Sequence, residues 1–236
     1  MSKCTAIVLA AGKGKRMQSK TPKQYMLLDG KPVLYYSLKA MEDSIIDEIV
    51  LVTSGDEISY CRKEIVEKYQ FKKVTAVVEG GAERYHSVFQ GIRAANPCDY
   101  LFIHDGARPF LTQDILNSAY ECVSKYNACV VAVPVKDTIK QVDDKGVVTK
   151  TLKREELYQI QTPQVFRFAL IKEAYEKLIA KEEEVKQRGI SITDDAMVLE
   201  TMMSYQVRIT EGSYTNIKIT TPEDICLAES IIKLYF

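Results

Sequence analysis

The sequence has no excess of either charge: Lys and Arg together total 32 of its 236 residues, and Asp and Glu also total 32. A coat that covers nucleic acid or a polybasic membrane surface requires a large surplus of cations. The balance therefore excludes both classes, and we predict neither nucleic acid nor a membrane among the partners. Any cationic site in this protein must be local.

Clusters of metal ligands and long apolar stretches are missing as well. The two histidines and six cysteines include no C-x-x-C pair, which excludes a zinc constellation. No stretch approaches the ~20 apolar residues of a membrane span, and the beginning of the chain lacks the apolar segment of a signal peptide. Cysteines within apolar runs are typical of reduced, buried thiols, so we expect a cytoplasmic location.

What the sequence does have is an alternation of strand-like and helix-like segments, in a composition that is 46% apolar and 27% charged. The expected strands are 4–9, 48–53, 74–78, 100–104 and 129–133, and the expected helices between them are 30–41, 56–69, 84–95 and 112–126. This order predicts an α/β, Rossmann-like fold with a mostly parallel central sheet and helices on both faces.

The second half of the chain breaks this rhythm with a polar hairpin. Residues 138–142 and 147–150 flank an Asp-Asp-Lys-Gly turn. We expect residues 136–156 to form a β-arm that leaves the single domain of residues 1–236 and packs on a partner; a solvated edge hairpin is the alternative. Further on we expect a charged helix over 167–187, strands over 206–210 and 216–219, and a helix that begins after Thr221.

A glycine-bearing, cationic turn follows the first strand. Gly12 and Gly14 allow backbone N–H groups to approach a ligand closely. Five cations fall within eleven residues: Lys13, Lys15, Arg16, Lys20 and Lys23. This combination predicts a polyphosphate site, although a basic surface loop is the alternative. Met17 replaces the third glycine of a dinucleotide fingerprint, and the Walker string is absent.

Two further loops follow strand ends, which is where ligands bind in such sheets. Gly80 and Gly81 permit the close approach of a ligand such as the edge of a base, and Ser87 follows one helical turn along. A plain turn before a helix is the alternative for this loop.

The loop after the fourth strand carries a carboxylate, Asp105, which needs a cationic partner at the end of an apolar strand. Asp105 could bind Mg²⁺, whose hard charge prefers carboxylate and phosphate oxygens, or form a structural pair with Arg108. We interpret the neighbouring His104 as a buried histidine and not as a base.

Hydroxyl and cationic side chains are scattered through the second half. Thr138, Arg154 and Thr162 lie on or around the arm, and such groups suit a phosphorylated polyol. Asp194 could cap a helix. Lys218 is a lone cation between two isoleucines, and its ammonium requires an anionic partner such as phosphate.

Eight motifs occur in one order across nearly the whole chain: L-A-A-G-x-G-x-R-M, P-K-Q, G-G-x-x-R-x-x-S-V, H-D-G-A-R-P, D-T-I-K, Q-T-P-Q-x-F, T-D-D-A and N-I-K-I-T-T-P-E-D. The set resembles the 2-C-methyl-D-erythritol 4-phosphate cytidylyltransferases of the non-mevalonate isoprenoid pathway. The related ribitol-5-phosphate cytidylyltransferases share the core, but Ala11 and the string His86-Ser87-Val88 favour the erythritol family. A non-catalytic nucleotide-binding module would be expected to lack Lys23, Asp105 or Lys218.

The resemblance implies transfer of CMP from CTP to a methylerythritol phosphate, with Mg²⁺ or another divalent cation as cofactor and a homodimer joined through the arm. The nucleophile would be a phosphomonoester, whose second pKa is near ~6, so it is ionised at neutral pH and needs no general base. The obstacle would then be repulsion between two anions, which cations can screen.

The resemblance also implies a role for each matching residue. The nucleotide would be bound by Ala10, Ala11, Gly12, Gly14, Gly81, Ser87, Asp105 and Gly106, with the metal at Asp105. The catalytic cations would be Arg16, Lys23 and Lys218. The polyol phosphate would be recognised by Arg108, Thr162 and Thr193, and by Thr138 and Arg154 from the partner subunit. The family often has an acid in place of Ala82 and an alanine in place of Gly106, and we expect the second departure to loosen the turn.

Overall fold

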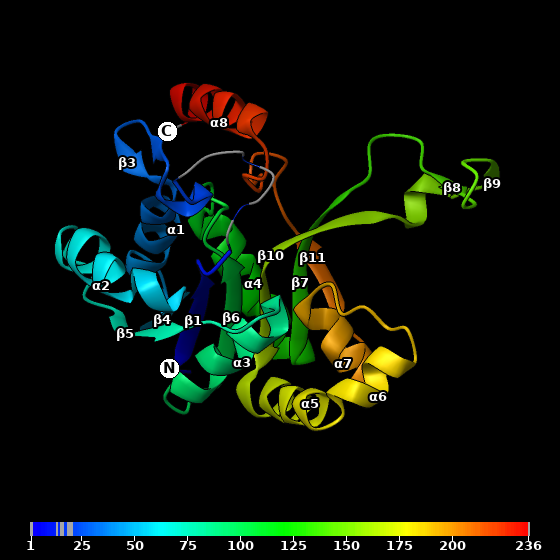
Figure 1. The fold of residues 1–236 in the computed structure, drawn as a ribbon, viewed down its shortest axis with the longest axis horizontal. Helices are drawn as coiled ribbons and strands as arrows, with labels where there is room; N and C mark the ends of the chain where they lie inside the picture. Colours follow the sequence, from blue (N-terminus) through cyan, green and yellow to red (C-terminus); the bar gives the residue numbers. More distant parts are fainter. Residues whose placement is uncertain (1, 13, 15–16, 18–20, 236) are drawn as a thin grey trace.

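The computed structural model describes residues 2–12, 14, 17 and 21–235, and in this part of the chain the central sheet has seven strands (Figure 1). Their order across the sheet is β11-β7-β10-β6-β1-β4-β5. The strands are β1 (Cys4–Leu9), β4 (Glu48–Thr53), β5 (Val74–Glu79), β6 (Tyr100–Asp105), β7 (Ala128–Pro134), β10 (Tyr158–Arg167) and β11 (Arg208–Glu211). Of these seven, β10 alone runs antiparallel to its neighbours. The predicted mostly parallel sheet is confirmed.

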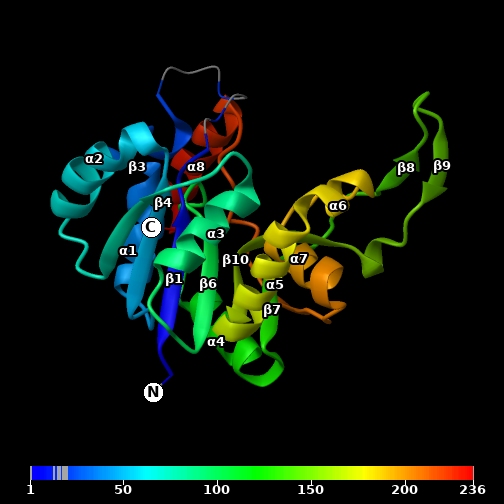
Figure 2. The same ribbon diagram turned by 60° about the horizontal axis from the view of Figure 1, so that its bottom comes forward.

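Helices cover both faces of the sheet (Figure 2). They are α1 (Val33–Glu42), α2 (Ile58–Tyr60), which continues as a π-helix (Cys61–Glu67), α3 (Arg84–Ala94), α4 (Gln113–Tyr126), α5 (Phe168–Ala180), α6 (Glu182–Gln187), α7 (Asp195–Met203) and α8 (Pro222–Tyr235). Because strand side chains alternate between faces, Ala6 and Val8 belong to the cluster that contains α1 and α4, whereas Ile7 belongs to the cluster that contains α3, α5 and α7. No helix in the described residues is both long and apolar enough to cross a bilayer.

A third, smaller core cluster attaches α8 near the end of β1. It joins Leu28 of the short strand β2 (Leu27–Leu28), Val33 at the start of α1, and Ile219 to the inner face of α8. The strand β3 (Lys31–Pro32) pairs with β2. This cluster brings the end of the chain beside the segment that carries Lys23.

The predicted hairpin is confirmed as a separate two-stranded sheet. It consists of β8 (Lys140–Val142) and β9 (Val148–Thr151), and both views show it projecting away from the central sheet (Figures 1 and 2). Three of its valines, Val142, Val147 and Val148, are more than half exposed. The hairpin therefore adds no apolar contact to the core of its own chain.

Strand β10 is absent from the predicted elements, although it lies in the middle of the sheet. Its central residues are polar and include Pro163, which is typical of a loop. The structure tolerates this proline because the pairing with β7 is interrupted between Ile160 and Gln164. Buried Gln161 and Gln164 both make hydrogen bonds, so their burial costs little. An apolar pattern cannot reveal such a strand.

Three other predictions need correction. Residues 216–219 form no strand; the segment is held by a hydrogen bond from the Ile219 N–H to the Ala107 carbonyl, at 2.9 Å, and by buried Asn216. The long helix predicted over 167–187 is two helices, α5 and α6, which meet at Lys181. The helix predicted over 30–41 begins only at Val33, as α1, because Lys31 and Pro32 still pair in β3.

Candidate active site

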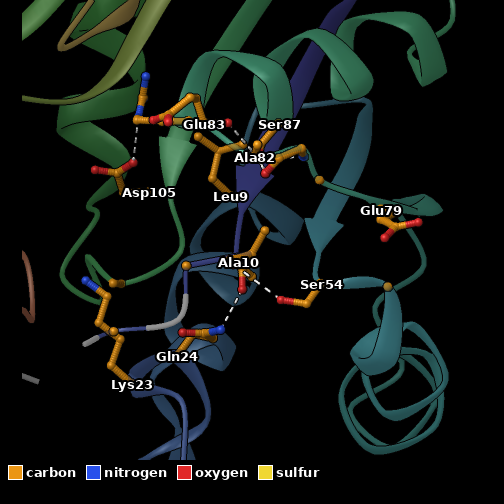
Figure 3. Close-up of a pocket in the computed structure, with 18 of the residues that line it drawn as sticks. Leu9, Ala10, Lys23, Gln24, Ser54, Glu79, Ala82, Glu83, Ser87 and Asp105 are labelled. Carbon is orange, nitrogen blue, oxygen red and sulfur yellow. Dashed lines mark hydrogen bonds and ion pairs between the residues drawn. The ribbon is translucent and has the colours of Figure 1, made fainter. Parts of the chain in front are cut away.

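The carboxyl ends of β1, β4, β5 and β6 surround a cleft of about 900 Å³. Figure 3 shows Lys23 and Asp105 on one side of it, and Ser54 and Glu79 on the other. The predicted site residues that line the cleft are Ala10, Ala11, Gly12, Gly14, Lys23, Gly81, Ser87, Asp105 and Lys218. Arg16, like Lys13, Lys15 and Lys20, lies outside the described residues.

The turn after β1 is fixed by hydrogen bonds to its carbonyl oxygens. Buried Gln24 donates to the Ala10 carbonyl at 2.6 Å, and the Ser54 hydroxyl donates to the Ala11 carbonyl at 3.3 Å. The Gly106 N–H donates to the Leu9 carbonyl at 2.9 Å. These contacts come from three different segments, so residues 9–11 at the start of the turn are held in one place relative to the neighbouring strand ends.

Gly80 allows the loop after β5 to approach this turn. A Cβ atom at Gly80 would lie 2.7 Å from the Ser87 Oγ and 2.8 Å from the Ala11 Cβ, which no side chain can tolerate. The Gly81 N–H donates to the Ser87 Oγ at 3.1 Å. Ser87 is therefore held beside Gly81, and the wall of the cleft at this point consists of backbone and one hydroxyl.

Asp105 is a buried carboxylate between two cations. Its Oδ2 lies 2.7 Å from the Lys218 Nζ, and its Oδ1 lies 3.4 Å from the Arg84 Nε. Burial acts to raise the pKa of Asp105, but Arg84 and Lys218 outweigh it and hold that pKa well below its usual range. The alternative of a structural pair with Arg108 is replaced by these two contacts, since the Arg108 Nη1 donates to the Asn216 carbonyl at 2.7 Å.

Two residues of this cluster, Arg84 and Asp195, were missed from the sequence. The Arg84 guanidinium binds both carboxylate oxygens of Asp195, at 2.8 and 2.7 Å. Asp195 is fully buried and also accepts a hydrogen bond from the Tyr175 hydroxyl. A signal was present: Asp194 caps α7 by accepting the Met197 N–H at 3.0 Å, which leaves the second acid of the T-D-D-A motif without a role at the helix end.

His104 is a neutral, buried histidine, as predicted. Burial lowers its pKa to about 4. Its Nε2 lies 3.2 Å from the Arg108 carbonyl and must donate, so its Nδ1 accepts from the Thr162 hydroxyl at 3.0 Å. The Thr162 oxygen in turn accepts the Asp105 N–H at 3.1 Å. His104 and Thr162 therefore orient Asp105 from behind the cleft.

The predicted polyol-binding residues do not line the cleft. Thr138 and Arg154 are exposed on the arm, and Thr193 is exposed just before α7. Arg108 retains a donor, because its buried Nε has no hydrogen-bond partner among the residues that the structure describes. Gly106 also lies behind the cleft, where a Cβ would be 2.8 Å from the Leu34 Cδ1, so glycine here makes room for that leucine.

The side chains that line the cleft can hold a magnesium ion only together with ligands from the substrate and water. Within the described residues, no three His, Cys, Asp or Glu side chains gather closely enough to hold a metal ion by themselves. Mg²⁺ is commonly bound by one or two carboxylates together with substrate phosphates and water. Asp105, ionised and beside the glycine turn, can supply that one carboxylate.

Comparisons with known proteins identify the family of this chain. A family model described as 2-C-methyl-D-erythritol 4-phosphate cytidylyltransferase matches residues 4–234. Curated proteins of that name from Lachnoclostridium phytofermentans and Lachnospira eligens are 49% and 50% identical to this chain; the matches cover 99% and 97% of this chain, and 97% and 99% of theirs. The solved 4-diphosphocytidyl-2C-methyl-D-erythritol synthase of Anaerococcus prevotii is 35% identical, with a TM-score of 0.84 over 98% of this chain and 96% of that one. The solved Francisella tularensis 2-C-methyl-D-erythritol 4-phosphate cytidylyltransferase is 30% identical, with a TM-score of 0.78 over 97% and 99%. This chain therefore belongs to the 2-C-methyl-D-erythritol 4-phosphate cytidylyltransferase family.

Proposed function

We propose that this chain transfers CMP from CTP to 2-C-methyl-D-erythritol 4-phosphate and releases pyrophosphate. One observation carries the proposal. The Lys23 Nζ donates to the carbonyl of Ile219 at 2.8 Å, so Lys23 from the start of the chain and Lys218 from near its end line the same cleft as the glycine turn. Two ammonium groups beside a glycine turn are suited to two phosphate groups that must meet.

The reaction begins with two anions that repel each other. The substrate phosphate is ionised at neutral pH and attacks the α-phosphorus of CTP; the bond from that phosphorus to the bridging oxygen breaks, and pyrophosphate departs. Lys23 and Lys218 lower the repulsion, align the groups and stabilise the charge that develops in the transition state. Arg16 would add a third cation. The neutral His104 is hydrogen-bonded on both ring nitrogens and is not required as a base.

Cytosine would be recognised at the loop after β5. Its ring has two acceptors, N3 and O2, and one exocyclic amine. The backbone around Gly81 and the Ser87 hydroxyl offer both donors and acceptors to such an edge. Because a Cβ at Gly80 would collide with Ser87 and Ala11, glycine at this position lets the loop after β5 pack against the turn after β1.

Asp105 would hold the divalent cation together with the phosphates of CTP. The ion would supply further positive charge to the phosphate oxygens when bound. Lys218 contacts the same carboxylate at 2.7 Å, and the remaining N–H groups of its ammonium would be available to a phosphate oxygen.

The arm would join two copies of the chain into a homodimer. Its exposed valines make no contact with their own core, and a second copy can cover them. We propose that residues 136–156 reach the partner's cleft and bring Thr138 and Arg154 to the polyol phosphate, while the rest of residues 1–236 acts as one nucleotidyltransferase domain. Arg108 would bind the same phosphate from its own chain.

The cytoplasmic location stays a prediction that the cysteine environments support. All six cysteines are unpaired in the structure, and Cys4, Cys61 and Cys129 are buried. Burial raises the pKa of the Cys4 thiol to about 12, so it has little thiolate character. Such thiols are suited to a reducing compartment.

The experiment that tests the function measures pyrophosphate release from a panel of nucleotides and acceptors. We expect turnover with CTP, a divalent cation and 2-C-methyl-D-erythritol 4-phosphate, and at least about 100-fold lower kcat/KM with UTP, because a 4-oxo group cannot replace the amine. Turnover with ribitol 5-phosphate alone would overturn the proposed acceptor, and no turnover with CTP and any polyol phosphate would overturn the reaction.

A further inference from the structure

Arg84 is shared between two carboxylates that contact different edges of its guanidinium. Its Nη1 and Nη2 bind the two oxygens of Asp195 at 2.8 and 2.7 Å, whereas only its Nε faces the Oδ1 of Asp105, at 3.4 Å. A guanidinium offers its donors in a rigid planar fork, so the edge that binds one carboxylate bidentately is not free for another. The contact with Asp105 is correspondingly long and single.

Hydrogen bonds with the side chains of Arg84, Tyr175 and Gln164 hold Asp195 in position. It is fully buried at the start of α7. Its Oδ1 accepts from the Tyr175 hydroxyl, and its N–H donates to the Gln164 Oε1 at 2.9 Å. Gln164 belongs to β10, two residues from the Thr162 that holds the Asp105 backbone. The same strand therefore positions both carboxylates relative to each other.

The second oxygen of Asp105 is left to Lys218. The Lys218 Nζ lies 2.7 Å from Oδ2, and its side chain is the more exposed of the two cations, at 38% against 29% for Arg84. If the fork of Arg84 were available to Asp105, it would bind both oxygens and compete with Lys218 directly, since bidentate pairs are the stronger ones.

We propose that Asp195 is a positioning residue for the transfer, because it occupies the fork of Arg84 and so keeps one oxygen of Asp105 for the catalytic Lys218. Asp195 does not line the cleft and acts through Arg84. The inference rests on the proposed function, in which Lys218 contacts the reacting phosphates. It assigns a function to the second acid of the T-D-D-A motif that capping of α7 by Asp194 does not explain.

The test is a double-mutant cycle between Asp195 and Lys218, two residues without a contact between them in the structure. We expect Asp195→Asn to lower kcat about tenfold or more while the KM for CTP changes less. We expect Lys218→Ala to lower kcat/KM about 100-fold in the unchanged chain but less than about tenfold in the Asp195→Asn background, because Lys218 has then already lost its place at Asp105. Additive effects of the two substitutions would overturn the proposal.

A matched control separates positioning from loss of stability. Val198→Ala removes two buried methyl groups from the same helix, within the apolar cluster that contains α3, α5 and α7, so we expect a lower Tm and an unchanged kcat. If Asp195→Asn does not fold, Arg84→Lys provides a second cycle with Lys218→Ala, since an ammonium has no fork with which to hold two carboxylates apart.

Calorimetry with CTP keeps the two possible failures apart, because it requires no turnover. An unchanged chain that binds CTP without transferring CMP would overturn the proposed function. Additive effects on kcat/KM in a chain that does transfer CMP would overturn the role of Asp195 alone.

Discussion

At the scale of single residues, the cleft is built from charges that tertiary structure brings together. The Lys23 Nζ reaches the carbonyl of Ile219, and Lys218 reaches Asp105, so segments from both ends of the chain meet at the glycine turn. The motifs of the sequence indicated Lys23, Asp105 and Lys218 as site residues, and all three line the cleft. The sequence could not predict that Arg84 bridges Asp105 and Asp195, because nothing around Arg84 at the start of α3 indicates which carboxylates its guanidinium contacts.

We expect Lys23→Ala to lower kcat by about 100- to 1,000-fold, because it removes a charge that stabilises the transition state. Stability should change little, since only the bond to the Ile219 carbonyl and other local contacts are lost. Pyrophosphate release measures the effect. Lys39→Ala, which breaks a surface pair with Asp43, serves as a control with normal turnover. Near-normal turnover of Lys23→Ala would remove Lys23 from the chemistry.

His104 makes the stability of the fold depend on pH. Burial lowers its pKa from 6.5 to about 4, so the unfolded chain takes up a proton first as the pH falls. The stability contributed by neutral His104 is complete above about pH 6.5 and is lost as the pH falls toward 4. We expect the free energy of unfolding to drop by about 2 kcal/mol between pH 7.5 and pH 5 because of this residue.

Urea denaturation at the two pH values measures this drop. His104→Gln, which cannot titrate, should remove most of it, even if the variant is less stable at both pH values. The second histidine, His86, provides the control: it lies half-buried on α3 beside Glu182, and His86→Gln should keep the drop. An equal drop in His104→Gln and in the unchanged chain would contradict the assignment.

At the scale of elements, apolar strands were predictable and polar ones were not. β1 and β4 were predicted to the residue, because both are buried apolar runs. β10 was missed because Pro163 and two glutamines sit in its middle, where an interrupted ladder and side-chain hydrogen bonds compensate for them. The strand predicted over 216–219 is absent for the opposite reason. The sequence alternates as in a strand and Ile219 is buried, but no neighbouring strand in the described part of the chain pairs with this segment.

Activity measurements can test whether the arm of one chain contributes to the cleft of its partner. Lys23→Ala damages the cleft of its own chain, and Arg154→Ala would damage the cleft of the partner. A heterodimer of the two variants would then contain one intact site and one doubly damaged site. We expect a mixture of the two inactive variants, unfolded and refolded together, to recover about a quarter of the normal activity, because half of the dimers are mixed.

Each variant refolded alone provides the control and should stay inactive. No recovery in the mixture, with dimers confirmed by sedimentation, would show that Arg154 serves its own chain or none. A monomer at all concentrations would contradict the role of the arm as a dimerisation element.

At the scale of the whole molecule, the fold places four strand ends around one cleft and anchors the end of the chain beside it. The third core cluster, with Val33, Ile219 and α8, sets the position of Lys218 relative to Lys23. The α/β class and the location of the cleft followed from the alternation of strands and helices. The contacts that orient Asp105 depend on β10 and α7, which pack beside it only in the folded chain.

The most direct measurement is a crystal structure of the protein with a non-hydrolysable CTP analogue and a divalent cation. We predict the triphosphate on the turn of residues 10–14, with the Lys23 and Lys218 Nζ atoms within hydrogen-bond distance of its oxygens and the cytosine against Gly81 and Ser87. A nucleotide bound away from this turn, with both lysines facing bulk solvent, would contradict a transfer that depends on cations holding two anions together.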